Sequence, residues 1–170
     1  MMIKLIQKIK HWIENSEKKL IIGISGHGAA GKTTFAHKLI EELKYDVNYL
    51  NTDPYIVSSS IRKFAVINYK YKETIHHFKM TACHPAAHHV PSLERDVLML
   101  KENMNLRTID THYLKSKILS PQNKLTIVEG MSVAFATPKL FDLLIYFYTD
   151  GDTELERRLG RDKEEQTLII

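Results

Sequence analysis

The sequence predicts one α/β domain of the doubly wound type, and three observations near the start of the chain support this fold class. Residues 20–25 form a short apolar run closed by glycines, which is typical of a strand buried on both faces. A glycine-rich loop follows. Residues 32–43 then place apolar side chains three and four apart, as an amphipathic helix does. A strand, a turn and a helix in this order begin a parallel α/β fold.

The composition agrees with a soluble globular domain spanning residues 1–170. The chain is 44% hydrophobic and 26% charged, which excludes disorder throughout. Its longest apolar runs fall far short of the roughly 20 residues that a spanning helix needs, so we expect no membrane partner. Cys83 is the single cysteine, and the basic start has no signal-peptide core, so we expect a cytoplasmic location.

Other segments give a coarse element order. Residues 2–17 predict an amphipathic helix that packs on the sheet; lying on a membrane surface is the less favoured alternative. Residues 45–51 alternate polar with apolar and predict an edge strand, whereas 54–80 allow no assignment. Residues 92–103 predict a helix with Ser92 as N-cap. The remaining expected elements are buried strands at 125–128 and 143–148 and a charged helix at 153–162, opened by the capping-box spacing of Thr153 and Glu156.

The glycine-rich loop carries the strongest chemical signal. Residues 26–33 fit G-x-x-x-x-G-K-[ST] at every fixed position. Glycines let the backbone curl so that successive N–H groups point inward, and the following helix presents its positive N-terminus to an anion. A polyphosphate suits such a loop, with Lys32 reaching the β- and γ-phosphates and Thr33 ligating Mg²⁺. The predicted nucleotide-binding residues are Gly26, His27, Gly28, Ala29, Ala30, Gly31, Lys32, Thr33 and Thr34.

Two acidic residues follow predicted strands and are expected at the same edge of the sheet. Asp53 precedes Pro54, which favours an extended backbone that projects the carboxylate from the strand end; there it could accept a proton from a substrate hydroxyl. Glu129 follows an apolar run and could hold a Mg²⁺-bound water. The alternatives are an ordinary turn aspartate and a solvated loop acid.

Arginines occur close together on the charged helix. Arg158 and Arg161 are three residues apart and so share a face. Such a pair on a mobile segment can close over phosphates and neutralise charge during phosphoryl transfer. The alternative is a solvated face with acidic salt-bridge partners, and both interpretations stay open.

Together these residues resemble the uridine kinase and phosphoribulokinase family of P-loop small-molecule kinases, and within it the uridine/cytidine kinases most. The resemblance runs from about residue 20 to residue 162. It rests on residues 26–34, Asp53 with Tyr55, His84-Pro85 with Ala87, Glu129-Gly130, and 142–162. The segment at about 152–165 looks like the family's lid.

The resemblance implies a P-loop NTPase-type three-layer fold with a parallel sheet in the order 2-3-1-4. It implies ATP and Mg²⁺ as cofactors and phosphoryl transfer to a hydroxyl of a small molecule, a nucleoside such as uridine or cytidine in the first place. Asp53 then corresponds to the catalytic base, and Arg158 and Arg161 to arginines that contact ATP phosphates. Tyr55 and His84 are the expected acceptor-site residues.

Departures from the family pattern keep other interpretations open. Cys83 stands where uridine kinases carry an aspartate for the ribose hydroxyls, and a thiol cannot accept the same bidentate hydrogen bonds. Residues 108–113 do not match the base-recognition stretch. The last residues lack two lid arginines, the last helix and the fifth strand, so we expect 143–148 to be an exposed apolar edge that favours a homo-oligomer. The alternatives are nucleotide binding without transfer and a kinase for a different alcohol.

Two further interpretations are less favoured. Histidines and a cysteine crowd residues 76–89, but the C-x₂-C pairing of structural zinc sites is absent. The basic segment 62–79 lacks nucleic-acid recognition motifs, so we expect no nucleic-acid partner.

Overall fold

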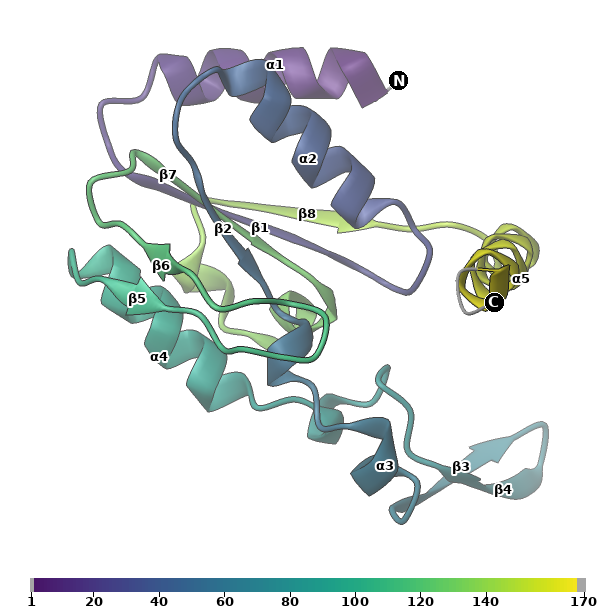
Figure 1. Ribbon diagram of the computed structural model, residues 1–170. Helices are drawn as coiled ribbons and strands as arrows, with labels where there is room; N and C mark the ends of the chain where they lie inside the picture. The colour runs from purple at the N-terminus through teal and green to yellow at the C-terminus, as the bar shows by residue number, and fades with distance from the viewer. Residues whose placement is uncertain (1, 168–170) are drawn as a thin grey trace.

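The protein is built around a four-stranded parallel sheet. The computed structural model describes residues 2–167, without the side chains of 161–167. The sheet order is β2-β7-β1-β8, and all three pairings are parallel (Figure 1). The strands are β1 (Leu20–Gly26), β2 (Asn48–Asn51), β7 (Leu125–Glu129) and β8 (Leu143–Phe147). Counted along the chain, this is the predicted order 2-3-1-4, and the α/β fold class is confirmed.

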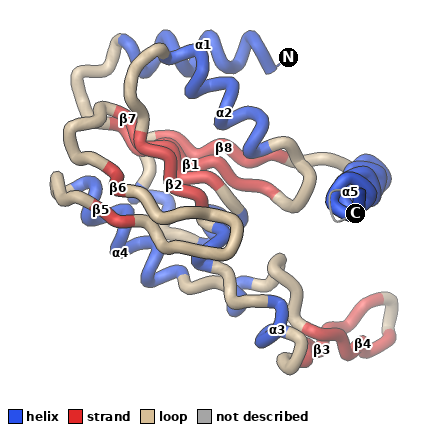
Figure 2. Tube along the Cα trace, viewed as in Figure 1, coloured by secondary structure: helices blue, strands red, loops and turns tan. Residues whose placement is uncertain are grey.

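Helices cover both faces of the sheet and complete three layers (Figure 2). The helices α1 (Met2–Glu14) and α2 (Lys32–Leu43) lie on one face, and α4 (Val90–Lys101) lies on the other. Successive side chains of a strand point to opposite faces. Ile21 of β1 accordingly belongs to the core beneath α4, whereas Ile22 belongs to the core beneath α1 and α2. The central strand is therefore buried on both sides, as predicted.

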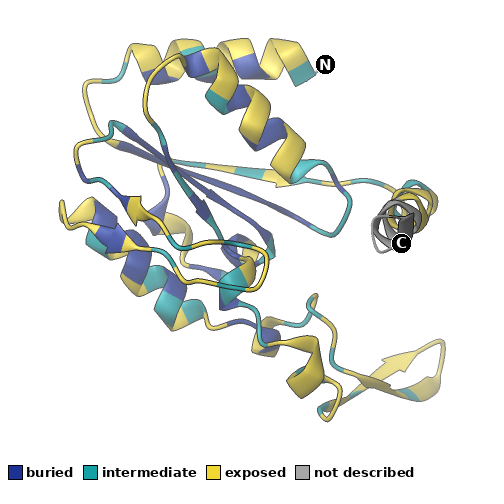
Figure 3. Cartoon of the chain, in the orientation of Figure 1, coloured by how far each residue is buried: buried dark blue, intermediate teal, exposed yellow. Residues whose placement is uncertain are grey.

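Of the unassigned residues 54–80, the first few pack against the domain, and those from residue 59 onward form an arm that projects from it (Figures 1 and 3). The arm contains α3 (Ser59–Arg62) and the antiparallel hairpin of β3 (Val66–Tyr71) and β4 (Thr74–Lys79). Its two-residue turn, Lys72 and Glu73, has positive φ angles of 46° and 59°. Asn-Gly is the common sequence for such a turn, so the sequence carried no hairpin signal. A smaller sheet pairs β5 (Leu106–Arg107) with β6 (Ile118–Leu119).

Several predicted helix boundaries are corrected by the structure. The helix α1 ends at Glu14 rather than at residue 17. His89 occupies the N-cap position of α4, so the assignment of Ser92 as N-cap is wrong. The helix α5 (Gly151–Thr167) begins before Thr153, because the Asp150 carboxylate accepts a hydrogen bond from the Thr153 N–H at 2.8 Å and thereby caps the first turn.

Two strands differ from the prediction in how they are buried. Asn48 of β2 is only 3% exposed. Its side-chain amide donates to the backbone carbonyl oxygen of Ser120 at 2.7 Å, and its Oδ1 accepts the Ser120 N–H at 3.0 Å. The polar residue was expected to face solvent, but these bonds satisfy it inside. The strand β8 is not fully buried, because Leu144 and Tyr146 are exposed on the edge predicted from the sequence. Among the described residues, no helix has the length and apolarity to cross a membrane.

Candidate functional site

The glycine-rich loop leaves β1 at Gly26 and enters α2 at Lys32. Two residues in the left-handed region, Ala29 (φ 59°) and Gly31 (φ 92°), curl the backbone. The Lys32 ammonium lies back over the loop and donates to the carbonyl oxygen of His27 at 2.9 Å. The curl directs loop amides and the N-terminus of α2 toward one region, as an anion site requires.

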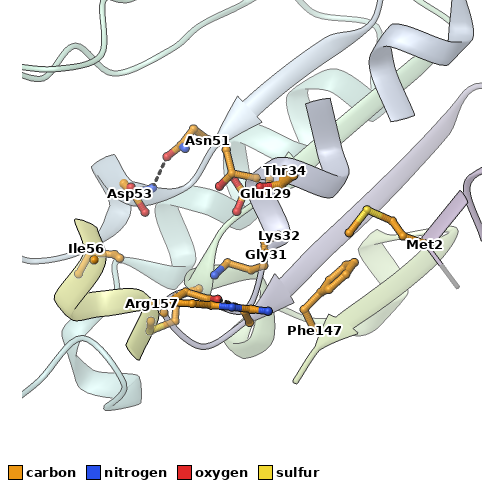
Figure 4. A pocket seen from close by; sticks show the side chains of 16 residues that line it. Met2, Gly31, Lys32, Thr34, Asn51, Asp53, Ile56, Glu129, Phe147 and Arg157 are labelled. Carbon is orange, nitrogen blue, oxygen red and sulfur yellow. Dashed lines mark hydrogen bonds between the residues drawn. The ribbon is translucent and has the colours of Figure 1, made fainter. Parts of the chain in front are cut away.

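A cavity of about 850 Å³ opens beside this loop (Figure 4). It lies at the carboxyl ends of the parallel strands, where open α/β sheets bind ligands. The residues that line it are Met2, Gly28, Ala29, Ala30, Gly31, Lys32, Thr33, Thr34, Asn51, Asp53, Ile56, Glu129, Met131, Phe147, Arg157 and Gly160. The predicted loop, both predicted carboxylates and one arginine thus share one cavity.

Glu129 ends β7 with its side chain almost fully buried, at 2% exposure. Its Oε2 accepts hydrogen bonds from the Thr33 hydroxyl at 3.2 Å and from the Tyr49 hydroxyl at 2.8 Å. Burial raises the pKa of Glu129, and these two bonds and Lys32 oppose the rise. Burial and the nearby carboxylate also raise the pKa of Tyr49, so the phenol keeps the proton that it donates.

Asp53 follows β2 and opens a 3₁₀ turn over Asp53–Tyr55. Its N–H donates to Oδ1 of Asn51 at 2.8 Å (Figure 4), which fixes the start of the turn. Desolvation raises the pKa of the Asp53 carboxyl, and the charge of Lys32 lowers it. Asp53 and Lys32 also line the same cavity, so the carboxylate lies on the side of the sheet edge that the glycine-rich loop occupies.

The arginines of α5 reach the loop in a different pattern from the one expected. Arg157 lines the cavity and donates to the carbonyl oxygen of Ala29 at 3.0 Å. Arg158 pairs with Glu154 and packs over Gly28, where an added Cβ would lie 2.5 Å from the guanidinium. The side chain of Arg161 lies outside the described residues. Helical spacing indicated which arginines share a face, but not which face meets the loop.

Other predicted site residues lie away from the cavity lining. His27 connects the loop to α5, with Nδ1 2.8 Å from Glu154 and Nε2 3.1 Å from the backbone of Thr149. Tyr55 is 1% exposed and donates to Asp96 at 2.5 Å in the core. His84 accepts a hydrogen bond from the Ala86 N–H at 3.2 Å and so caps a local turn. The structure therefore gives these three residues structural contacts.

The donor set fits a magnesium ion better than a zinc ion. Mg²⁺ takes oxygen ligands and keeps several waters, so one or two protein oxygens beside a phosphate suffice. The Thr33 hydroxyl and the Glu129 carboxylate supply such oxygens, and a hydrogen bond from Thr33 to Oε2 of Glu129 holds the two groups side by side. Within the described part of the chain, no group of three or more histidines, cysteines or carboxylates is placed to hold a metal.

A phosphate loop between a central parallel strand and a helix, facing two carboxylates at the same sheet edge, defines a P-loop α/β protein. The profile of the Phosphoribulokinase / Uridine kinase family matches residues 21–167. The chain belongs to this family of kinases.

Named relatives agree with this assignment. A uridine kinase of Lactobacillus helveticus (strain DPC 4571) is 31% identical over 162 residues, which span 88% of this chain and 71% of that protein. Uridine-cytidine kinase-like 1 of Mus musculus is 32% identical over 161 residues, 89% of this chain but 28% of that protein.

Two solved structures share the fold. One, described as a possible uridine kinase from Bacillus stearothermophilus, has a TM-score of 0.58 at 18% identity and covers 97% of this chain and 91% of its own. The other, a provisionally assigned fructose transport system kinase from Silicibacter sp. TM1040, has a TM-score of 0.68 at 15% identity and covers 98% of this chain and 83% of its own. At these identities the likeness concerns the fold alone.

Proposed function

We propose that the protein is an ATP- and Mg²⁺-dependent kinase that phosphorylates a hydroxyl of a small molecule, a nucleoside such as uridine or cytidine. The observation that carries this proposal is the shared cavity of the phosphate loop and the Asp53 carboxylate. The nucleoside class rests on the relatives named uridine kinase. The cytoplasm remains the predicted location.

Each group in the cavity has a role in this reaction. The loop amides and Lys32 bind the β- and γ-phosphates, and Thr33 and Glu129 would hold Mg²⁺, which supplies positive charge beside the phosphates. The substrate oxygen attacks the γ-phosphorus while the bond to the β-phosphate oxygen breaks, and the hydroxyl proton passes to Asp53. Because transfer of this kind needs mainly positioning and charge stabilisation, Arg157 and Arg158 contribute by binding phosphate oxygens, and Arg161 is proposed to do the same.

We infer an arrangement of the two substrates from the residues at each end of the cavity. Asp53 and Ile56 stand at one end, Met2 and Phe147 at the other, and Lys32 lies between them (Figure 4). The acceptor hydroxyl must approach Asp53, so the acceptor occupies the first end. The nucleotide base then lies at the second end, against a thioether and an aromatic ring, which suit a flat apolar surface.

ADP release in the presence of ATP, Mg²⁺ and a panel of nucleosides and other small alcohols tests the proposal. Asp53→Asn should lower turnover by about 10²- to 10⁴-fold, the usual contribution of a positioned base, and leave ATP binding intact. Asp46→Asn is the matched control, because Asp46 is exposed just before the same strand. Equal turnover in Asp53→Asn would refute the role of the base.

The alternative is a protein that binds ATP without transferring phosphate. It is favoured by Cys83, which is exposed and carries no carboxylate. Tight ATP binding with no ADP release for any acceptor in the panel would support this alternative.

A further inference from the structure

We propose that Tyr49 and Asn51 are positioning residues that hold the metal-binding carboxylate of Glu129 and the turn bearing Asp53 in one fixed arrangement. This inference rests on the proposed function and deepens it. Both residues belong to β2 and are two apart, so they point to the same side of the strand. Both are half-buried, whereas Asn48 and Leu50 on the opposite side are buried in the core.

The first link joins β2 to the end of β7. The Tyr49 hydroxyl donates to Oε2 of Glu129 at 2.8 Å, and the Thr33 hydroxyl donates to the same oxygen at 3.2 Å. Glu129 also stands beside Asn51 in the parallel register. Two donors on one oxygen fix the plane of the carboxylate, and they leave Oε1 as the oxygen to which neither donates. Tyr49 thereby decides which oxygen Glu129 presents to a metal.

The second link joins β2 to the Asp53 turn. Oδ1 of Asn51 accepts the Asp53 N–H at 2.8 Å, which anchors the turn to the end of β2. The next residue, Thr52, donates its backbone N–H to the carbonyl oxygen of Glu129 at 2.8 Å. The end of β2 therefore ties the Asp53 turn to the strand end that carries Glu129.

The Tyr49 ring is itself held in place from two sides. The ring of His37, from α2, meets it edge-on with centroids 5.4 Å apart. The Lys117 ammonium lies 5.3 Å from the ring centroid, within the range of a cation–π contact. A ring that cannot swing keeps its hydroxyl on Glu129. Partners behind a ligand typically change metal affinity or activity by about 10- to 100-fold when removed.

The test is a Tyr49→Phe variant, which keeps the ring and removes only the hydroxyl. Mn²⁺ is titrated into protein with ADP, and free Mn²⁺ is followed by electron paramagnetic resonance, so no acceptor substrate is required. We expect Mn²⁺ affinity to fall about 10- to 100-fold in Tyr49→Phe and to be unchanged in Tyr146→Phe, whose tyrosine is exposed on β8. Asn51→Ala should lower kcat at saturating Mg²⁺ more than it lowers Mn²⁺ affinity.

A Glu129→Gln variant distinguishes failure of the metal site from failure of the positioning role of Tyr49. Loss of Mn²⁺ affinity in Glu129→Gln with wild-type affinity in Tyr49→Phe would overturn the role of Tyr49 and leave the proposed metal site standing. Wild-type affinity in Glu129→Gln would overturn the metal site itself, and the positioning role with it. Melting temperatures of the metal-free variants identify any Mn²⁺ loss that follows from unfolding.

Discussion

Replacing Gly26 by alanine should destabilise the protein severely, for two reasons visible in the structure. Gly26 has a φ of 143°, a conformation that L side chains rarely adopt, and an added Cβ would collide with the carbonyl oxygen of Phe147. That oxygen belongs to the backbone of β8, which pairs with β1 at this position. Removing this collision therefore requires the two strands to move apart, because the clashing atom belongs to the backbone and not to a flexible side chain.

The expected change in the free energy of unfolding follows from a comparison of three glycines. Gly31 also has a positive φ, 92°, but no atom lies within 4 Å of its added Cβ, and Gly160 has neither problem. Left-handed strain alone costs about 1–2 kcal/mol, and a collision with a packed backbone adds about 1–3 kcal/mol. We expect the free energy of unfolding to fall by about 2–5 kcal/mol in Gly26→Ala and by about 1–2 kcal/mol in Gly31→Ala. Gly160→Ala should gain about 1 kcal/mol, because alanine favours a helix.

Urea unfolding followed by circular dichroism measures these differences. For a domain of this size, each kcal/mol corresponds to about 2–4 °C in the melting temperature, so the three variants should be clearly separated. Gly31→Ala should also bind ATP more weakly while remaining folded, since its strain turns a loop amide away from the phosphates. An equal loss of stability in Gly31→Ala and Gly26→Ala would refute the prediction, because the collision with the Phe147 carbonyl oxygen would then contribute nothing.

The remaining predictions concern two carboxylates. Burial raises the pKa of Glu129 in the folded protein above its ordinary value of 4.5. The free energy of unfolding therefore falls as the pH rises from this ordinary value to the raised pKa, because Glu129 then ionises more easily in the unfolded chain. Glu129→Gln should therefore melt above the wild type at pH 8 and lose this advantage at pH 4; a constant difference at both pH values would contradict this. Glu154→Gln weakens the contacts with His27 and Arg158. Since partly exposed pairs contribute only about 0.2–1 kcal/mol, overall stability should barely change while amide exchange in α5 rises, and unaltered exchange would count against the ion pairs as its tether.

The fold was largely predictable because its signals are local. A central strand buried on both faces must be apolar throughout, and β1 is followed by a motif whose glycines serve the phosphate loop. The sheet order came from the family resemblance rather than from strand patterns. The arm was not predictable, because a hairpin that closes through Lys72 and Glu73 and exposes most of its side chains leaves neither a turn motif nor a buried pattern to detect.

The placement of two candidate residues at one sheet edge was predictable from their positions after strands. Glu129 ends β7, and Asp53 lies two residues beyond the end of β2, where it opens a 3₁₀ turn instead of the extended backbone expected before Pro54. Topology alone brings such residues to one edge. The sequence pattern indicates only that Tyr49 belongs to an edge strand, because its hydrogen bond depends on a residue 80 positions away. For Tyr55 and His84 the family resemblance implied an acceptor-site role, which stays a prediction. In the structure the Tyr55 hydroxyl donates to Asp96, and Nδ1 of His84 accepts the Ala86 N–H.

The contacts of α5 bear on how its arginines would serve the proposed transfer, which begins and ends with an open cavity. Leu155 and Leu159 are 58% and 52% exposed, so an apolar face contributes little to holding this helix against the loop. The contacts of α5 with the loop include polar ones: Arg157 donates to the carbonyl oxygen of Ala29, and Glu154 pairs with His27. Within the helix, Glu154 also pairs with Arg158. A bound phosphate can replace Glu154 as the partner of Arg158 at little cost, because one charge-assisted hydrogen bond is exchanged for another. A helix tethered in this way can respond to nucleotide without disrupting the core, whereas a helix docked by buried leucines could not.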